Sequence, residues 1–399
     1  MIARTATVFS ELSGWARRVA RRLRRPARVL AVVSAVVLLI AVAAVAALRL
    51  QFTGTPAAWA KTTGHDALWL GHAWVDGRRT EADVAALAVR LRATGIRDVY
   101  VHSGPFEWDG RLPPSKYPNA GNFLKWWREH LPGVRVSAWL GQVVKNGLDL
   151  GDPAARRRVV AGAAGLARLG FDGVHYDFEP VGDGDRNLLE VLRATRAAIG
   201  PGRVLSVATH QIEPLAGVRH PFRLVLGHDK YWTPGYFRQV AALTDQVAIM
   251  TYDSFLPLAG LYGGHVVRQA ALALEHVPAE KTILIGAPAY HDHGWHRLDA
   301  AESVAVAAEG ARLALTRHGR PRERFGLALY VDFAATEQDW REYQEGWVAP
   351  RQGASREGGT EGARSRSGAG RVALHCRERG TPGRPSRPPA AKALCPALI

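Results

Sequence analysis

The chain has 399 residues, 47% hydrophobic and 22% charged, which is a globular composition long enough for one large barrel or two ordinary domains. Its formal net charge of +16 is concentrated at the ends, because residues 1–50 carry +8 and residues 350–399 carry +7, leaving +1 for the middle. A nearly neutral middle lacks the basic surface that nucleic acids require, so nucleic acid is excluded as a partner.

The N-terminal segment combines an arginine cluster over residues 17–28 with an uncharged apolar run over residues 29–48. As a helix, that run would span roughly 30 Å, the thickness of a bilayer's hydrocarbon core. The basic residues 1–28 are expected in the cytoplasm, which places the rest of the chain on the extracytoplasmic side of the cell membrane. A cleaved signal peptide, followed by secretion, is the alternative because Ala58-Trp59-Ala60 offers a small-residue cleavage site. The length of the run favours an uncleaved, single-pass anchor.

After an expected linker over residues 49–64, short apolar runs alternate with longer amphipathic ones as far as residue 348. The first pair predicts a strand over 67–74 and a helix over 81–95. Seven more strands are predicted over 98–104, 134–141, 173–178, 204–210, 246–253, 282–290 and 325–333, each followed by a helical pattern. Eight such units over 65–348 predict an α/β fold of the (β/α)8 TIM-barrel type. A doubly wound sheet is less favoured, because no glycine-rich phosphate loop follows the first strand.

The C-terminal segment, residues 349–399, is rich in Arg, Gly, Ser and Pro and has no apolar period. Such a composition predicts disorder. The segment begins directly after a complete eighth unit, so a genuine basic tail and the product of a reading-frame error are both open interpretations. Both cysteines, Cys376 and Cys395, lie in this segment, so the barrel can hold neither a disulfide nor a thiolate metal site.

The fourth predicted strand, within "FDGVHYDFEP" (residues 171–180), ends in many polar side chains. Side chains alternate along a strand, which places one set, Val174, Tyr176 and Phe178, against the helices and the other, His175, Asp177 and Glu179, inside the barrel. Catalytic groups in this fold stand at the C-terminal ends of strands. A structural network, in which His175 and Asp177 satisfy each other, is the alternative interpretation.

The segment "DGVHYDFE" (172–179) resembles the Asp-Gly-x-Asp-x-Asp-x-Glu signature of glycoside hydrolase family 18, the chitinase-like family. On the sixth strand, "MTYD" (250–253) is similar to the family's Met-x-Tyr-Asp. On the eighth strand, "GLALY" (326–330) is similar to Gly-x-x-x-Trp, with Tyr330 replacing Trp. The resemblance covers about residues 65–348. His175 departs from the pattern, where the family has a carboxylate, and is expected either to donate a hydrogen bond to Asp177 or to titrate near neutral pH.

The resemblance implies hydrolysis in which the substrate's own acetamido oxygen acts as nucleophile. Glu179 would be the general acid, Asp177 would bind the acetamide N–H, and Tyr252 would donate to the acetamide oxygen. Further residues expected to contact substrate are Asp253, His175, Met250, Tyr330, Trp139, Gln142 and Trp74. His72, His102 and Phe333 are expected at the same barrel mouth. No cofactor and no metal are expected, and the histidine-rich segment 291–296 is interpreted as a rim loop.

These features predict a membrane-anchored, extracytoplasmic glycoside hydrolase that cleaves β-linked N-acetylated amino-sugar glycans of the peptidoglycan or chitin type, with retention. The alternative is a catalytically inactive barrel that binds such glycans, which the histidine at position 175 would permit. The presence of Glu179 argues for the enzyme, because a binding protein has no need of a general acid. The sequence does not indicate an oligomeric state.

Overall fold

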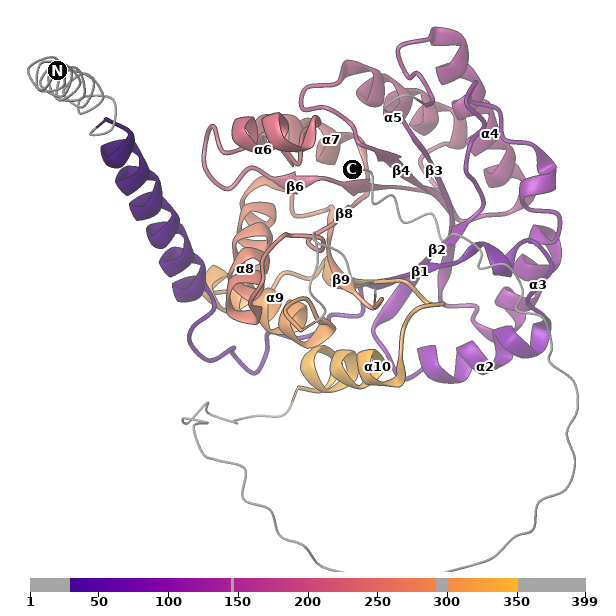
Figure 1. Cartoon of the computed structure of the whole chain (residues 1–399). Coiled ribbons are helices and arrows are strands. Elements are labelled where there is room, and N and C mark those ends of the chain that lie inside the picture. Colours follow the sequence, from indigo (N-terminus) through magenta and orange to yellow (C-terminus); the bar gives the residue numbers. More distant parts are fainter. Residues whose placement is uncertain (1–28, 145–146, 292–299, 351–399) are drawn as a thin grey trace, which may run out of the picture. The chain divides into compact units, whose positions relative to one another are not determined.

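A computed structural model describes residues 29–144, 147–291 and 300–350. Eight parallel strands close into a barrel in the order β1-β10-β9-β8-β5-β4-β3-β2, with helices around the outside (Figure 1). The predicted (β/α)8 barrel is therefore confirmed. The expected basic segment 1–28, and the expected tail from residue 351 onward, lie outside the described residues.

The barrel strands are β1 (Asp66–Leu70), β2 (Ile96–His102), β3 (Arg135–Val143), β4 (Gly173–Glu179), β5 (Val204–Thr209), β8 (Gln246–Ile249), β9 (Thr282–Pro288) and β10 (Phe325–Tyr330). The outer helices are α2 (Glu81–Leu91), α3 (Ala120–His130), α4 (Pro153–Leu169), α5 (Arg186–Ile199), α7 (Pro234–Leu243), α8 (Ala259–His276), α9 (Val304–His318) and α10 (Glu337–Tyr343). An insertion between β5 and α7 adds β6 (Gln211–Ile212), α6 (Arg219–Leu226) and β7 (Tyr231–Trp232). The short strands β6 and β7 pair with each other outside the barrel.

The alternation predicted for β4 is present in the structure. The side chains of Val174, Tyr176 and Phe178 are buried in the hydrophobic layer, and the hydroxyl of Tyr176 lies 2.7 Å from Thr195 Oγ1 on α5. An outward tyrosine that contacts a surrounding helix leaves the neighbouring positions, His175 and Asp177, to face the barrel interior.

The first strand is shorter than expected, because β1 ends at Leu70 and residues 72–74 form a 3-10 turn. The carboxylate of Asp332, which follows β10, explains the turn. It accepts hydrogen bonds from the backbone N–H of Gly71 at 2.7 Å and from Nε1 of Trp74 at 2.7 Å. These two bonds draw the chain away from the strand direction directly after Leu70.

Among the described residues, one helix is long and apolar enough to cross a membrane, namely Val29–Gln51 near the N-terminus. The segment expected as a linker does not hang free, because Phe52 and Ala60 are buried within the hydrophobic core cluster. Arg312 of α9 donates a 2.7 Å hydrogen bond to the carbonyl oxygen of Ala60. Residues 52–64 are therefore packed as part of the barrel domain.

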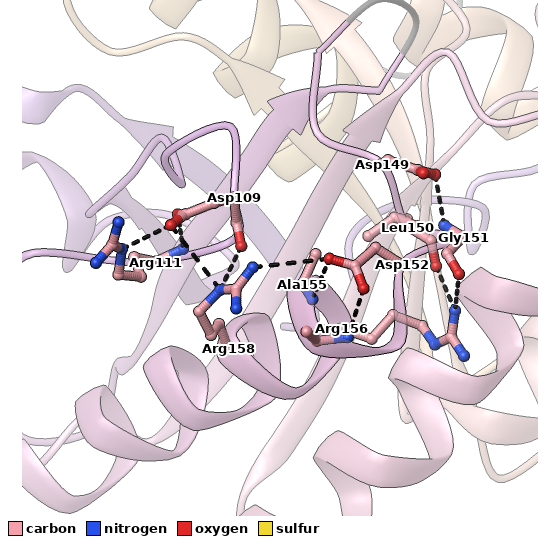
Figure 2. Close-up of polar contacts among 10 residues, drawn as sticks. Asp109, Arg111, Asp149, Leu150, Gly151, Asp152, Ala155, Arg156 and Arg158 are labelled. Carbon is pink, nitrogen blue, oxygen red and sulfur yellow. Dashed lines mark hydrogen bonds and ion pairs between the residues drawn. The ribbon is translucent and has the colours of Figure 1, made fainter.

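Arginines at the start of α4 fasten the neighbouring loops at the mouth end of the barrel. Arg156 donates to the carbonyl oxygens of Leu150 and Gly151 at 2.6 and 3.1 Å, and Arg158 donates to that of Asp109 at 2.6 Å (Figure 2). The side chains of Arg156 and Arg158 are partly buried and bind loop backbone, so they stabilise these loops in addition to contacting solvent.

Candidate active site

Carboxyl and phenol groups gather where β4 and β8 end at the barrel mouth. Asp177 and Glu179 stand at the end of β4, while Tyr252 and Asp253 follow the end of β8. The negative charges of Asp177 and Asp253 act on Glu179, and all three carboxylates act on Tyr252. The structure thus brings together the four residues that the two sequence motifs supply.

Asp177 is held by a neighbour on β3. The indole Nε1 of Trp139 donates a 2.8 Å hydrogen bond to Oδ2 of Asp177, whereas Oδ1 is buried without a hydrogen-bond partner among the described residues. Burial raises the pKa of Asp177 to about 6, and the bond from Trp139 partly opposes that rise. An unsatisfied carboxylate oxygen aimed into a protein interior is a site for a donor group on a ligand.

Glu179 has the environment of a proton donor. Burial raises the pKa of its carboxyl well above the ordinary value, and the nearby charges of Asp177 and Asp253 raise it further. A carboxyl group whose pKa is raised in this way retains its proton toward neutral pH, as general acid catalysis requires.

His175 does not contact Asp177 as expected from the sequence. Its Nε2 accepts a 3.1 Å hydrogen bond from Trp69 Nε1, its Nδ1 lies 2.8 Å from Ser206 Oγ, and its ring stacks on Tyr100 at 3.8 Å. An indole N–H can only donate, so Nε2 carries no proton and Nδ1–H donates to Ser206. Burial lowers the pKa of His175 to about 3, so the expectation of titration near neutral pH is also wrong.

Aromatic rings from β1, β3 and β10, and from the segments that follow β8 and β9, meet inside the barrel mouth. Tyr330 stacks on Tyr252 with ring centres 5.2 Å apart, and meets Trp69, Trp139 and Tyr290 edge-on at 5.6, 6.0 and 5.5 Å. Burial, followed by the charge of nearby groups, raises the pKa of Tyr252 well above its ordinary value, so its phenol stays a hydrogen-bond donor. Tyr330 supports Tyr252 within this cluster and is itself buried.

A clamp around Asp253 was not predicted from the sequence. Glu302 accepts hydrogen bonds from the backbone N–H groups of Asp253 and Ser254, both at 2.8 Å. Lys230 Nζ donates to the carbonyl oxygen of Asp253 at 2.8 Å, and the hydroxyl of Tyr290 donates to its Oδ1 at 2.7 Å. Asp253 has φ of 52°, in the left-handed region, which is costly for a residue with a side chain. The clamp holds this conformation.

Several solved structures have a fold similar to this barrel. The spore cortex-lytic enzyme SleL of Bacillus cereus has a TM-score of 0.51 at 15% identity, over 72% of this chain and 75% of that one. The SleL of Bacillus megaterium QM B1551 has a TM-score of 0.50 at 14% identity, over 72% and 75% of the two chains. A class V chitinase of Pseudomonas fluorescens Pf-5 has a TM-score of 0.50 at 16% identity, over 70% and 98%. No protein-family model matches the sequence, and no curated protein matches it significantly.

The chain has the fold of a chitinase-like barrel.

Within this chitinase-like barrel, two of the expected substrate contacts lie elsewhere. Gln142 pairs in register with outward-facing Phe178, and its side chain donates to the carbonyl oxygen of Phe106 at 2.5 Å. Trp74 is buried against Phe123 of α3, so neither is placed to meet a sugar. The prediction for Gln142 was wrong because side chains alternate along a strand. Gln142 is three residues after the inward-facing Trp139 and therefore faces outward.

The remaining mouth residues of the chitinase-like barrel are close to their expected places. Met250 is half-buried directly after β8, and Phe333 is exposed after β10. His72 and His102 lie against each other, with ring centres 5.4 Å apart, and His102 meets Trp139 edge-on. In the histidine-rich segment, His291 Nε2 lies 2.8 Å from Asp339 Oδ2 on α10, while residues 292–299 are outside the described residues.

Proposed function

We propose that this protein is a membrane-anchored glycoside hydrolase that cleaves β-linked N-acetylated amino-sugar glycans outside the cytoplasmic membrane. The observation that carries the proposal is Glu179, a carboxyl at the barrel mouth whose pKa is raised by burial and by two neighbouring carboxylates. A group of this kind is suited to protonate a glycosidic oxygen. The motif resemblance on β4 and β8, together with the chitinase-like fold, supports the same chemistry.

In the proposed reaction, Glu179 gives its proton to the leaving glycosidic oxygen as the bond to the anomeric carbon breaks. The acetamido oxygen of the same sugar forms a bond to that carbon and yields an oxazolinium ion. Glu179, now ionised, then takes a proton from water, whose oxygen attacks the anomeric carbon. The bond from that carbon to the acetamido oxygen breaks, which opens the oxazolinium ring and retains the anomeric configuration overall. No second carboxylate nucleophile is required.

The neighbours of Glu179 have matching roles in this proposal. The unpartnered Oδ1 of Asp177 accepts the acetamide N–H, and the negative charge of Asp177 stabilises the oxazolinium ion. The phenol of Tyr252 donates to the acetamide oxygen, since its raised pKa keeps it protonated. Trp139 and the clamp of Lys230 and Glu302 hold these groups in place.

For the substrate, we propose a glycan of the cell envelope. The proteins of similar structure include a spore cortex-lytic enzyme and a chitinase, which supports peptidoglycan-type and chitin-type glycans. The apolar helix Val29–Gln51 would hold the barrel next to the cell wall, which favours peptidoglycan or a related envelope glycan.

An inactive glycan-binding barrel is the second candidate, and the partners of His175 favour it. Because His175 is neutral and bonded to Trp69 and Ser206, it can neither pass a proton to Asp177 nor take one from it. The site would then have to work without a proton exchange between the two inner positions of β4.

The full-length protein in vesicles, incubated with N-acetylated and with deacetylated oligosaccharides, tests the proposal. Glu179→Gln should lose at least about 100-fold in kcat, the size expected for a general acid, whereas Glu129→Gln, an exposed substitution on α3, should not. Turnover that survives in Glu179→Gln would overturn the proposal. Equal cleavage of deacetylated glycans would remove the substrate-assisted step, and binding without turnover would favour the second candidate.

A further inference from the structure

Helix α6 presents large apolar side chains to solvent. Leu224 is 86% exposed and Val225 is 79% exposed, and Leu215, just before the helix, is 70% exposed. No residue of α6 is buried. Isolated exposed leucines are common, but a group of them on one short helix indicates a surface that is covered in use.

The surroundings of these side chains extend the apolar surface. A cavity of about 260 Å³ lies between α6 and the turn after β8, lined by Pro221, Phe222, Val225, Leu226 and Phe255. Leu258, three residues after Phe255, is also exposed. We call Leu215, Phe222, Leu224, Val225, Phe255 and Leu258 the apolar rim.

The charges on α6 are all positive. Its sequence, "RHPFRLVL", contains the cations Arg219 and Arg223, the imidazole of His220 and no acidic residue. Arg219 pairs with Asp183 at 2.7 Å, whereas His220 and Arg223 are exposed beside the leucines. Exposed basic and apolar residues on one short helix are the pattern of a helix that lies in a membrane interface containing anionic lipids.

The contacts of the N-terminal helix place its end near the same rim. Phe52 lies so close to α8 that a side chain at Gly263 would overlap its ring, and a side chain at Gly264 would overlap the carbonyl oxygen of Leu48. The apolar run ends at Leu48, so the membrane boundary would lie only about 6 Å along the helix from Phe52. Gly263 belongs to the second turn of α8, which begins at the mouth end of the barrel because it follows β8.

The distances along the chain are short enough to connect the two features. Leu258 precedes Gly263 by five residues, or about 8 Å along α8, and Phe255 joins the cavity beneath α6. The end of the anchor and the apolar rim therefore both lie beside the N-terminal part of α8 or the turn that precedes it.

We propose that the apolar rim docks on the outer surface of the lipid bilayer that the N-terminal helix crosses, with α6 lying in the interface. This inference rests on the membrane anchoring in the proposed function. Docking at this rim would turn the barrel mouth toward the membrane surface, so the substrate would be a glycan held close to the bilayer rather than one at the outer edge of the wall.

Site-directed fluorescence on the full-length chain tests the docking. With Cys376 and Cys395 replaced by Ser, single cysteines introduced by Leu224→Cys, Val89→Cys and Val36→Cys are labelled with an environment-sensitive dye. The chains are reconstituted in vesicles of zwitterionic lipid with anionic lipid, with and without doxyl-labelled lipid as quencher. Val89 on α2 is 70% exposed and serves as the matched control, and Val36 reports on the anchor.

Doxyl lipid should quench the label at position 224 at least about twofold more than the label at position 89, with a larger difference when anionic lipid is present. Quenching at position 36 without quenching at position 224 would overturn the docking and leave the anchor intact. Absence of quenching at both positions would overturn the anchor and the docking together. A shift in the dye's emission at position 224 that depends on protein concentration and not on doxyl lipid would also overturn the docking. A second copy of the chain would then cover the rim. Turnover of glycan is measured separately, so failure of the proposed activity is distinguishable from failure of docking.

Discussion

The indole N–H of Trp139, in the middle of β3, donates a 2.8 Å hydrogen bond to Oδ2 of Asp177 near the end of β4. This bond favours the ionised carboxylate, in opposition to burial, which raises its pKa. The balance between these two effects determines the pH at which Asp177 carries the negative charge that the proposed oxazolinium ion requires.

Removal of that donor should therefore change both the rate and its pH dependence. Trp139→Phe is expected to lower kcat/KM by about 10-fold, the effect of one hydrogen bond to a charged group. The acid limb, expected near pH 6 in the unchanged protein, should move to higher pH because the ionised form of Asp177 loses a stabilising partner. A pH profile of kcat/KM measures both, with Trp59→Phe as a control, and an unmoved acid limb would contradict the assignment.

His175 should contribute to stability and not to the pH profile. In His175→Asn the N–H of Trp69 is left unpaired in the core, which should lower the free energy of unfolding by about 1–3 kcal/mol. Since burial holds the pKa of His175 near 3, the side chain is neutral throughout the range from pH 5 to 8, and the limbs of the profile should stay in place. Loss of a limb in this variant would show that His175 titrates during turnover.

Asp177 should destabilise the barrel at high pH. Its pKa is raised from 3.8 to about 6 in the folded state, so the folded protein binds more protons between these values, and stability decreases as pH rises through 6. Asp177→Asn should therefore increase the free energy of unfolding by about 1–3 kcal/mol at pH 8 and by little at pH 4. Thermal unfolding at the two pH values measures the difference. An equal effect at both would contradict the role of charge.

The backbone clamp on Asp253 should support catalysis without contacting substrate. Glu302→Gln keeps the shape of the side chain but replaces one acceptor oxygen with an NH2 group that faces a backbone N–H of Asp253 or Ser254. We expect kcat to fall by about 10-fold through loss of alignment, with KM less affected. Glu280→Gln, on an exposed loop, is the matched control. An unchanged kcat with a lower melting temperature would show that Glu302 is only structural.

The segment after the N-terminal helix should be needed for barrel stability. Phe52→Ala removes a buried ring from the core cluster and should cost about 3–5 kcal/mol. Trp59→Ala, in the same segment but 39% exposed, should cost less than half of that. Chemical denaturation compares the two variants. Equal small losses would mean that residues 52–64 are a passive linker.

The order of apolar runs determined the barrel, because period-two strands alternating with amphipathic helices can bury their faces in few ways. The same alternation placed Asp177 and Glu179 inside the mouth and Tyr176 outside. It did not predict the position of Gln142 correctly, because a shift of one residue along a strand moves a side chain from the inner face to the outer face. The insertion with α6 was missed because its two short strands carry too little pattern to be distinguished from a loop.

The sequence by itself thus determined which carboxylates meet, through the strand ends to which the motifs belong. Only the tertiary structure decided what state those groups are in. His175 is neutral because Trp69 and Ser206, 106 and 31 residues away along the chain, occupy its two nitrogens, and such distant partners leave no local signal. Glu302 and Lys230 likewise reach Asp253 from separate loops. Burial and hydrogen bonding depend on what the closed barrel brings together, and they shift the pKa values of His175, Asp177 and Glu179.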